Sequence, residues 1–384
     1  MRKHARPVVV AAGLALAFPL AQPAAADGVG ADAEPVIERT DLADAGDGAH
    51  TWRIPALEVL DDGTLVAAYD RRQDDASDLP GNLDIMIRRS TDRGQTWSAP
   101  EPVVDYDNGI GAGDPSLLYD QEADRLFLFH AYAPEGVSFH DSSDGNSNDA
   151  DDILHTDVSY SDDGGQTWET KRITEDVKDP SWFGTFASSG TGIQLSDGRL
   201  VQQYAFDDGD DIHAVSVYSD DHGETWQAGE PVGPGMDENK TVELSDGRVM
   251  LNSRTADGPY RMVSYSEDGG ETYSDPVPDH DLVDPANNAG IVRYDADAQE
   301  GTPEARRLLF TNTDHESSRQ NLTVRMSCDD GGSWPVSRAL ETGAAGYSTV
   351  VSLGDDEFGV LYERGDYEHI TFARFNSAWL GESC

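Results

Sequence analysis

The chain has 384 residues, of which 73 are acidic and 27 basic, so its formal net charge is −46 at pH 7. This length is enough for one large domain. Such a charge excludes binding to nucleic acid, whose phosphates would repel it, and is typical of a strongly hydrated surface.

The first 26 residues have the pattern of a secretory signal peptide. Three basic residues lie within the first six positions, an apolar run follows from about Val8 to Ala21, and small residues precede a cleavage point before Asp27. This run is too short for a membrane anchor, and no other run approaches the roughly eighteen residues that a spanning helix needs. We therefore expect an exported protein without a membrane anchor. Its mature chain has 24 basic and 73 acidic residues, a net charge of −49.

Residues 27–45 form a short lead-in, and strand patterns dominate from residue 46 onward. The segments "DIMIRRSTD" (84–92), "HAVSVYSDD" (213–221) and "RMVSYSEDG" (261–269) alternate apolar and polar residues and then reach a turn. No long amphipathic pattern of helical period competes with them. An all-β domain over residues 46–384 is therefore expected.

One short motif, which we call the box, occurs five times, each at the end of such a pattern. In each box an aspartate and a glycine suit a hairpin turn, in which the carboxylate accepts backbone N–H bonds and the glycine adopts a positive φ. The closing aromatic residue is expected to pack between adjacent sheets. The copies are "STDRGQTW" (90–97), "SDDGGQTW" (161–168), "SDDHGETW" (219–226), "SEDGGETY" (266–273) and "SCDDGGSW" (327–334).

The spacing of the boxes predicts the number of repeats. Their first serines are 71, 58, 47 and 61 residues apart, and a period of about 59 is typical of propellers or solenoids. Dividing the roughly 340 residues of the domain by this period gives about six. The sequence thus predicts a six-bladed β-propeller in which one blade lacks a box.

Two cysteines, Cys328 and Cys384, would lie in an oxidising compartment if the chain is exported. A bridge between them would tie the last box to the C-terminal segment. The sequence alone does not show that they meet.

The five boxes, following an "RIP" tripeptide at residues 53–55, resemble those of bacterial exo-sialidases (neuraminidases) of the six-bladed propeller superfamily. The resemblance covers essentially the whole mature chain. Similar boxes occur in non-enzymatic propellers and other glycosidases, so the specific signal lies in polar residues outside them. The resemblance implies that Arg53, Arg254 and Arg319 hold a substrate carboxylate, and that Glu363 in "YERG" braces the first of them. A guanidinium fork suits a carboxylate in a way that lysine does not.

The resemblance also implies three catalytic residues. Tyr347 in "AAGYSTVVSL" matches the nucleophile, and Glu238 in "MDENKTVEL" matches its base, with Glu243 as the rival. Sialidases are an exception to the two-carboxylate pattern of glycosidases. A neutral phenol approaches a carbon that bears a carboxylate without the repulsion an anion would meet. Asp78, in the loop before "LPGN", matches the general acid. Its neighbours Asp74, Asp75 and Asp84 are the alternatives, of which Asp84 is interpreted as structural.

Four further residues are candidates for sugar contacts under the same resemblance. Arg72 and Asp114 would hold the O4 of the sugar, and Ile54 and Trp182 would line a pocket for the N-acetyl group. A surface ion pair or a core aromatic residue is an equal interpretation for each of them.

The function that the resemblance implies is that of a secreted retaining exo-α-sialidase, monomeric, acting on sialylated glycans without a metal or organic cofactor. Two other enzymatic activities stay open: a trans-sialidase, and a sialidase that prefers the deaminated sugar. A catalytically silent sialic-acid-binding propeller would keep the arginines and lose Tyr347, Glu238 or Asp78. All three residues are present.

Overall fold

The computed structural model describes Met1 and residues 34–106, 110–299, 301–381 and 384. Apart from Met1, the predicted signal peptide lies outside the described residues. Strands dominate the described part of the chain. Its helices are short: α1 (Thr174–Val177), α2 (Ser377–Leu380) and the 3₁₀ turn η1 (Glu304–Arg306). None of the described helices has the length and apolar character needed to cross a membrane.

The first four blades each occupy a separate sheet, and hydrogen-bonded neighbours in a sheet are mostly consecutive in sequence. Blade 1 contains β2 (Thr51–Val59), β3 (Leu65–Arg72), β4 (Leu83–Ser90) and β5 (Glu101–Val104). Blade 2 contains β6 (Gly111–Asp120), β7 (Arg125–Ala133), β8 (His155–Ser161) and β9 (Glu169–Arg172), with β11 (Gly190–Thr191) parallel to β6. Blade 3 contains β10 (Thr185–Ala187), β12 (Ile193–Gln194), β13 (Leu200–Asp207), β14 (Ile212–Ser219) and β15 (Gln227–Ala228). Blade 4 contains β16 (Asn239–Glu243), β17 (Val249–Ser253), β18 (Tyr260–Ser266) and β19 (Val277–Val283).

The fifth sheet holds two blades that share one long strand. The first half of β23 (Val336–Gly354) pairs with β22, whereas its second half pairs with β24. Blade 5 therefore ends, and blade 6 begins, within β23, which gives six blades in the described part of the chain. The other strands are β20 (Gly290–Arg293), β21 (Leu308–Thr313), β22 (Gln320–Ser327), β24 (Glu357–Arg364), β25 (His369–Asn376) and β1 (Ile37–Asp44).

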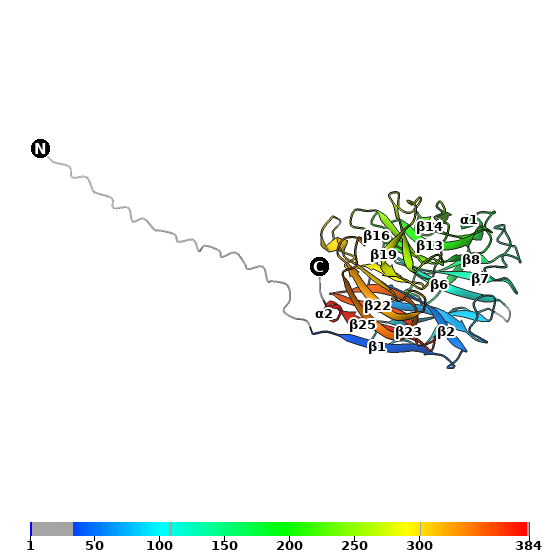
Figure 1. Cartoon of the computed structure of the whole chain (residues 1–384), viewed down its shortest axis with the longest axis horizontal. Helices are drawn as coiled ribbons and strands as arrows, with labels where there is room; N and C mark the ends of the chain where they lie inside the picture. Colours follow the sequence, from blue (N-terminus) through cyan, green and yellow to red (C-terminus); the bar gives the residue numbers. More distant parts are fainter. Residues whose placement is uncertain (2–33, 107–109, 300, 382–383) are drawn as a thin grey trace. The chain divides into compact units, whose positions relative to one another are not determined.

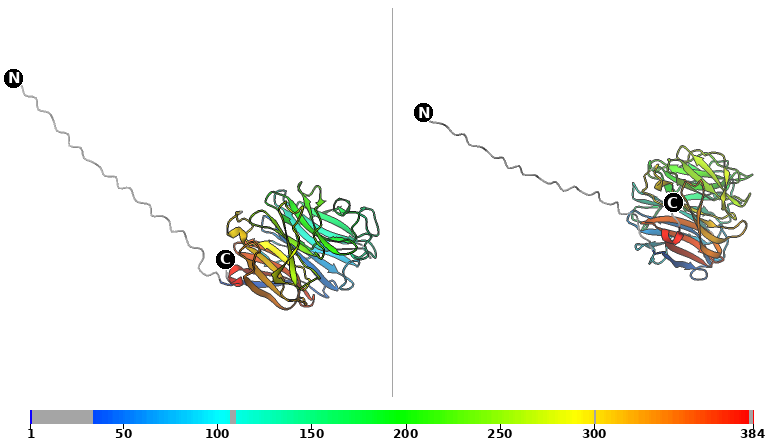
Figure 2. Two further views of the ribbon diagram at one scale, coloured as in Figure 1. Left: turned by 45° about the horizontal axis from the view of Figure 1, so that its top comes forward. Right: turned by 60° about the vertical axis from the view of Figure 1, so that its left-hand side comes forward.

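The blades follow one another around the domain. In Figure 1 the colours pass from blue β2 through cyan β7 and green β13 to yellow β19, orange β22 and red β25. Figure 2 shows blue and red strands side by side in two further views. The buried apolar clusters lie between neighbouring blades. One, for example, joins Leu57 of β2 to Phe372 of β25, and another joins Phe129 of β7 to Phe206 of β13. The core therefore consists of packed sheet faces.

The boxes are turns between the third and fourth strands of a blade, as predicted. In the first box Asp92 accepts hydrogen bonds from Ser90 Oγ (2.8 Å), Thr96 N (2.8 Å) and Thr96 Oγ1 (2.6 Å). Gly94 has φ +80°, and a Cβ there would lie 2.0 Å from the Phe372 ring of blade 6. Trp97 packs edge-on against the same ring, with centroids 5.1 Å apart. Boxes follow β4, β8, β14, β18 and β22, so blade 6 is the blade without one.

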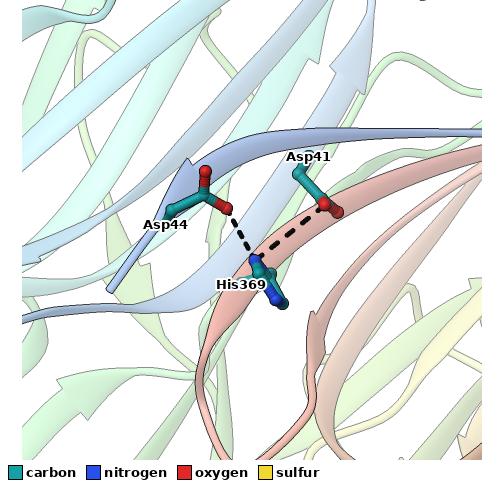
Figure 3. A group of neighbouring side chains, drawn as sticks. All are labelled: Asp41, Asp44 and His369. Carbon is teal, nitrogen blue, oxygen red and sulfur yellow. Dashed lines mark hydrogen bonds and ion pairs between the residues drawn. The ribbon is translucent and has the colours of Figure 1, made fainter. Parts of the chain in front are cut away.

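The ring is closed by β1, which pairs antiparallel with β25. The predicted lead-in, residues 27–45, thus contains the outer strand of blade 6, and the predicted domain start at residue 46 is too late. Polar groups reinforce this pairing: His369 Nδ1 lies 2.6 Å from Asp44 and 3.9 Å from Asp41 (Figure 3). Cys328 and Cys384 form a disulfide, which ties the last box to the C-terminal segment.

Candidate active site

Several candidate residues lie at the same end of the propeller because they belong to equivalent loops of different blades. Asp78 lies in the β3–β4 loop, Arg254 in the β17–β18 loop and Arg319 in the β21–β22 loop, all of which join a second strand to a third. The boxes join third strands to fourth strands, so they lie at the other end. Residues distant in sequence therefore meet at one mouth.

The inner strands are irregular where they carry site residues. The pairing register shifts between Arg53 and Ala56 in β2, between Gly113 and Ser116 in β6, and between Ala345 and Ser348 in β23. Ile54 and Asp114 have φ +60° and +59°, which is unusual for residues other than glycine. Bulges re-aim side chains near functional sites. Here they accompany Arg53, Asp114 and Tyr347.

Glu363 holds Arg53 and two neighbouring backbone groups. It is fully buried, and it accepts bonds from Arg53 Nε (2.9 Å), Ile54 N (3.0 Å) and Tyr347 N (2.9 Å). The predicted contact between Glu363 and Arg53 is thus present. A Cβ on Gly346 would lie 2.1 Å from Glu363 Oε2, so only glycine fits beside this carboxylate.

We expect Glu363→Gln to destabilise the protein and to raise KM. The amide NH₂ would face an N–H donor on whichever side it turned, and Arg53 would lose its counter-ion. Breaking a buried pair in this way costs about 3–5 kcal/mol. Thermal unfolding measures the loss of stability, and steady-state kinetics measure the rise in KM. Glu357→Gln, which weakens a pair with exposed Arg93, is the control and should change stability by less than about 1 kcal/mol. An unchanged Tm in Glu363→Gln would contradict this role.

Arg254 contacts both Tyr347 and Glu238. Arg254 Nη1 donates to the Tyr347 hydroxyl (2.6 Å) and pairs with Glu238, while its other edge pairs with Asp237 Oδ2 (2.7 Å). Burial raises the pKa of Glu238, against the opposing charge of Arg254, and the Tyr347 hydroxyl stabilises the ionised carboxylate. Burial also raises the pKa of Tyr347. A neutral phenol therefore lies beside a carboxylate that is a stronger base than usual.

All three predicted arginines surround the Tyr347 ring. The Cζ atoms of Arg53, Arg254 and Arg319 lie 5.2, 5.9 and 5.0 Å from its centroid. Arg319 donates to Tyr367 Oη (3.1 Å) and to the carbonyl of Ala286 (3.1 Å). The arrangement concentrates positive charge around one phenol, which suits an anionic ligand.

Asp78 lies at the edge of this group, and its side chain is 77% exposed. It pairs with Arg72 Nη1 (2.7 Å) and lies 3.6 Å from Arg53 Nη1. Partial desolvation of the carboxyl by its neighbours would raise the pKa of Asp78, but Arg72 and Arg53 outweigh it and leave the pKa below its ordinary value. Asp78 is therefore ionised at neutral pH when no ligand is bound.

Behind Asp78 lies a second pair of acids. Asp70 is buried and pairs with Arg72 (3.2 Å), and its Oδ1 accepts from Asp114 N (3.1 Å). Burial raises the pKa of Asp70 to about 7, despite Arg72. Burial and the neighbouring charges of Asp70 and Asp78 raise the pKa of Asp114 well above its ordinary value. Asp114 thus holds a proton more readily than an ordinary aspartate does.

A cavity of about 210 Å³ opens among these residues. Its polar lining includes Asp78, Asp114, Glu238, Arg254 and Tyr347. Its apolar lining was not predicted, except for Ile54; it consists of Ile54, Leu79, Phe139, Leu154, Phe186 and Ile212. Polar and apolar side chains thus line the same cavity.

The structure does not bring Trp182 to this cavity. Its ring stacks on Phe206 at 3.7 Å within the core between blades 2 and 3, so its core interpretation is the one that fits. The rival residues are also placed elsewhere. Glu243 accepts two bonds from Ser196, at 2.9 and 2.6 Å. Asp84 is buried and pairs with Arg71 (2.6 Å), which confirms its structural interpretation.

Besides the apolar lining of the cavity, sequence reasoning missed Asp237 and Tyr367 at the mouth. Asp237 directly precedes Glu238, and its place beside an expected base was an available signal. Tyr367 lies in the β24–β25 loop, two residues after the "YERG" motif. Only knowledge that loops between second and third strands face the mouth would have pointed to it.

Among the described residues, one group of three side chains has the spacing of a metal site: Asp41, Asp44 and His369 on the β1–β25 pair (Figure 3). Asp41 also accepts bonds from Arg364 (2.6 Å) and Thr371 (2.6 Å). A metal ion would have to displace the guanidinium of Arg364. These contacts explain the group as an ion-paired clasp of the ring.

Comparison with known proteins agrees with this geometry. A family model described as BNR repeat-like domain matches residues 63–361. The chain belongs to the BNR repeat-like family. Within it, the chain is 47% identical over 389 residues to a sialidase of Micromonospora viridifaciens, covering 98% of this chain and 59% of that protein. It is 30% identical over 341 residues to a sialidase of Bacteroides fragilis, covering 85% of this chain and 62% of that protein.

The fold of this BNR repeat-like chain is similar to a solved structure of Hadza microbial sialidase Hz136. The TM-score is 0.82 at 31% identity, over 88% of this chain and 68% of that one. The predicted resemblance to bacterial sialidases and the all-β propeller fold are thereby confirmed. The chain spans about 60% of the length of the two sequence relatives named above.

Proposed function

We propose that this chain is a retaining exo-α-sialidase that releases terminal sialic acids from glycans. The observation that carries the proposal is the convergence of three arginines on Tyr347, which itself contacts the Arg254–Glu238 pair. Sialic acid bears a carboxylate on its reacting carbon. A ligand whose carboxylate lies among the arginines therefore presents that carbon to the Tyr347 oxygen.

In the first step the Tyr347 oxygen bonds to the anomeric carbon while the glycosidic C–O bond breaks. The phenol proton passes to Glu238, and the departing oxygen takes a proton from Asp78. In the second step Asp78 accepts a proton from water, whose oxygen bonds to the anomeric carbon. The bond to Tyr347 breaks, and Glu238 returns the phenol proton. Two displacements at one carbon retain its configuration.

Asp78 must gain a proton before it acts as the acid. In the unliganded protein Arg72 and Arg53 hold its pKa low. A substrate carboxylate bound to Arg53 offsets one of these charges, so the pKa of Asp78 rises when the substrate is bound. Binding of the substrate therefore favours the protonated form of Asp78, which is the form that acts as the acid.

The test follows sialyllactose by proton NMR after addition of the purified protein. The expected first product is the α-anomer of free sialic acid, which then mutarotates. Initial release of the β-anomer would overturn retention, and transfer to a second sugar without free acid would favour a trans-sialidase.

We propose further that the chain is exported after cleavage before Asp27 and acts as a monomer. N-terminal sequencing of the secreted protein and analytical ultracentrifugation test these points. A mature protein that still begins at Met1, or a dimer at micromolar concentration, would contradict them.

A further inference from the structure

Tyr367 lies in the tight β24–β25 loop at the mouth of the propeller. It has φ +60°, a left-handed conformation that residues with a side chain seldom adopt. Its carbonyl accepts a bond from Thr51 Oγ1 (3.1 Å), which fixes the loop to β2 two residues before Arg53. The backbone of Tyr367 is thus held in an unfavourable conformation by contact with the strand that carries Arg53.

The side chain of Tyr367 contacts two of the three arginines. Its ring lies 4.3 Å from Arg53 Cζ, and its hydroxyl accepts from Arg319 Nη1 at 3.1 Å. Gly346 leaves room for it, since a Cβ there would lie 3.0 Å from Tyr367 Cε1. The half-buried ring therefore bridges Arg53 and Arg319.

The partners of the three arginines differ in charge. Arg53 pairs with Glu363, and Arg254 pairs with Asp237 and Glu238. Within the described part of the chain, the hydrogen-bond partners of Arg319 are both neutral, the Tyr367 hydroxyl and the Ala286 carbonyl. Arg319 is thus oriented by the protein without being neutralised by it.

We propose that Tyr367 is a positioning residue that orients Arg319 through a neutral hydrogen bond and leaves its charge free for the carboxylate of the ligand. A carboxylate at this place would orient Arg319 equally well, but it would compete with the ligand. The inference rests on the proposed function, because it takes sialic acid as the ligand.

The test compares Tyr367→Phe with the wild type in binding two probes, 2-deoxy-2,3-didehydro sialic acid and its neutral methyl ester. The variant keeps the ring over Arg53 and removes the acceptor for Arg319. The affinity for the acid should fall about 5- to 20-fold, as expected for the loss of a partly exposed hydrogen bond to a charged group. The affinity for the ester should stay within about twofold. With sialyllactose, KM should rise while kcat stays within about threefold.

Two further variants isolate the mechanism. Tyr294→Phe removes a hydroxyl bonded to Asp356 (2.8 Å), outside the cavity, and should change neither probe's affinity. In an Arg319→Ala background, Tyr367→Phe should have no further effect on binding of the acid, because it acts through Arg319. Thermal unfolding checks that all variants are folded.

The outcomes separate the two proposals. A wild type that hydrolyses sialyllactose, together with a Tyr367→Phe variant of unchanged affinity for the acid, overturns the role of Tyr367 and leaves the proposed function standing. Equal losses for acid and ester, or additive losses with Arg319→Ala, also overturn it. A wild type that binds the acid but releases no sialic acid overturns the proposed function, while the difference between acid and ester still decides the role of Tyr367.

Discussion

Replacing Tyr347 with phenylalanine is expected to lower kcat on sialyllactose by about 10³-fold or more, as losses of a covalent nucleophile do. The variant loses the oxygen that would attack the anomeric carbon, whereas the ring keeps its place among the three arginines. Arg254 keeps its pairs with Glu238 and Asp237. The free energy of unfolding should therefore change by only about 1 kcal/mol. Stopped assays of released sialic acid measure kcat, and calorimetry measures the free energy of unfolding.

Tyr204→Phe is the matched control for this substitution. Tyr204 is fully buried between blades 2 and 3, and its hydroxyl has no hydrogen-bond partner among the described residues. Its removal should leave kcat unchanged. If Tyr347→Phe kept near-normal turnover with retention of configuration, the nucleophile would have to be another residue.

Asp78→Ala is expected to have an effect that depends on the leaving group. A sugar alcohol needs a proton to depart, so release from sialyllactose should fall about 10²- to 10⁴-fold. A nitrophenol leaves as its own anion, so formation of the tyrosyl intermediate from a nitrophenyl sialoside should be much less affected. Pre-steady-state measurement of nitrophenol release gives this rate directly.

The dependence of kcat and kcat/KM on pH should also report the titration of Asp78. Because Arg72 and Arg53 depress the pKa of Asp78 in the free protein, and the bound substrate offsets Arg53, the alkaline limb of kcat should lie at higher pH than that of kcat/KM. Both limbs should disappear in Asp78→Ala. Asp74→Ala, on the exposed part of the same loop, should leave them in place. Equal losses of intermediate formation on both substrates would mean that Asp78 holds the loop rather than donates the proton.

Much of this architecture was predictable because its signals are local. Each box contains its own turn chemistry, as Asp92 and Gly94 show, so five copies and one spacing predicted six blades. The three arginines, Tyr347 and Glu363 came from resemblance rather than from spacing. The structure brings these five residues together, although they lie on four different blades.

The features that escaped prediction depend on contacts distant in sequence. Nothing in "IERTDLAD" distinguishes a strand of blade 6, because its partners lie at the other end of the domain. Trp182 resembles a pocket residue by its position, but its packing on Phe206 decides its place. The bulge at Ile54 and the left-handed Tyr367 follow from how β2 meets the last blade. No single segment encodes them.

The pairing of β1 with β25 also determines when this protein can finish folding. Asp41 and Thr371, which hydrogen-bond across the pair, are 330 residues apart, so the first strand is made long before its partner. At ribosomal speeds of about 5–20 residues per second, this interval is roughly 20–70 s. During it, blade 6 is incomplete and the apolar face of blade 1 that packs against it stays exposed, and such surfaces favour aggregation. Loss of residues 37–44 should therefore leave blade 6 without its outer strand, whereas loss of residues 369–376 should harm the protein more, because it also leaves β1 without its partner.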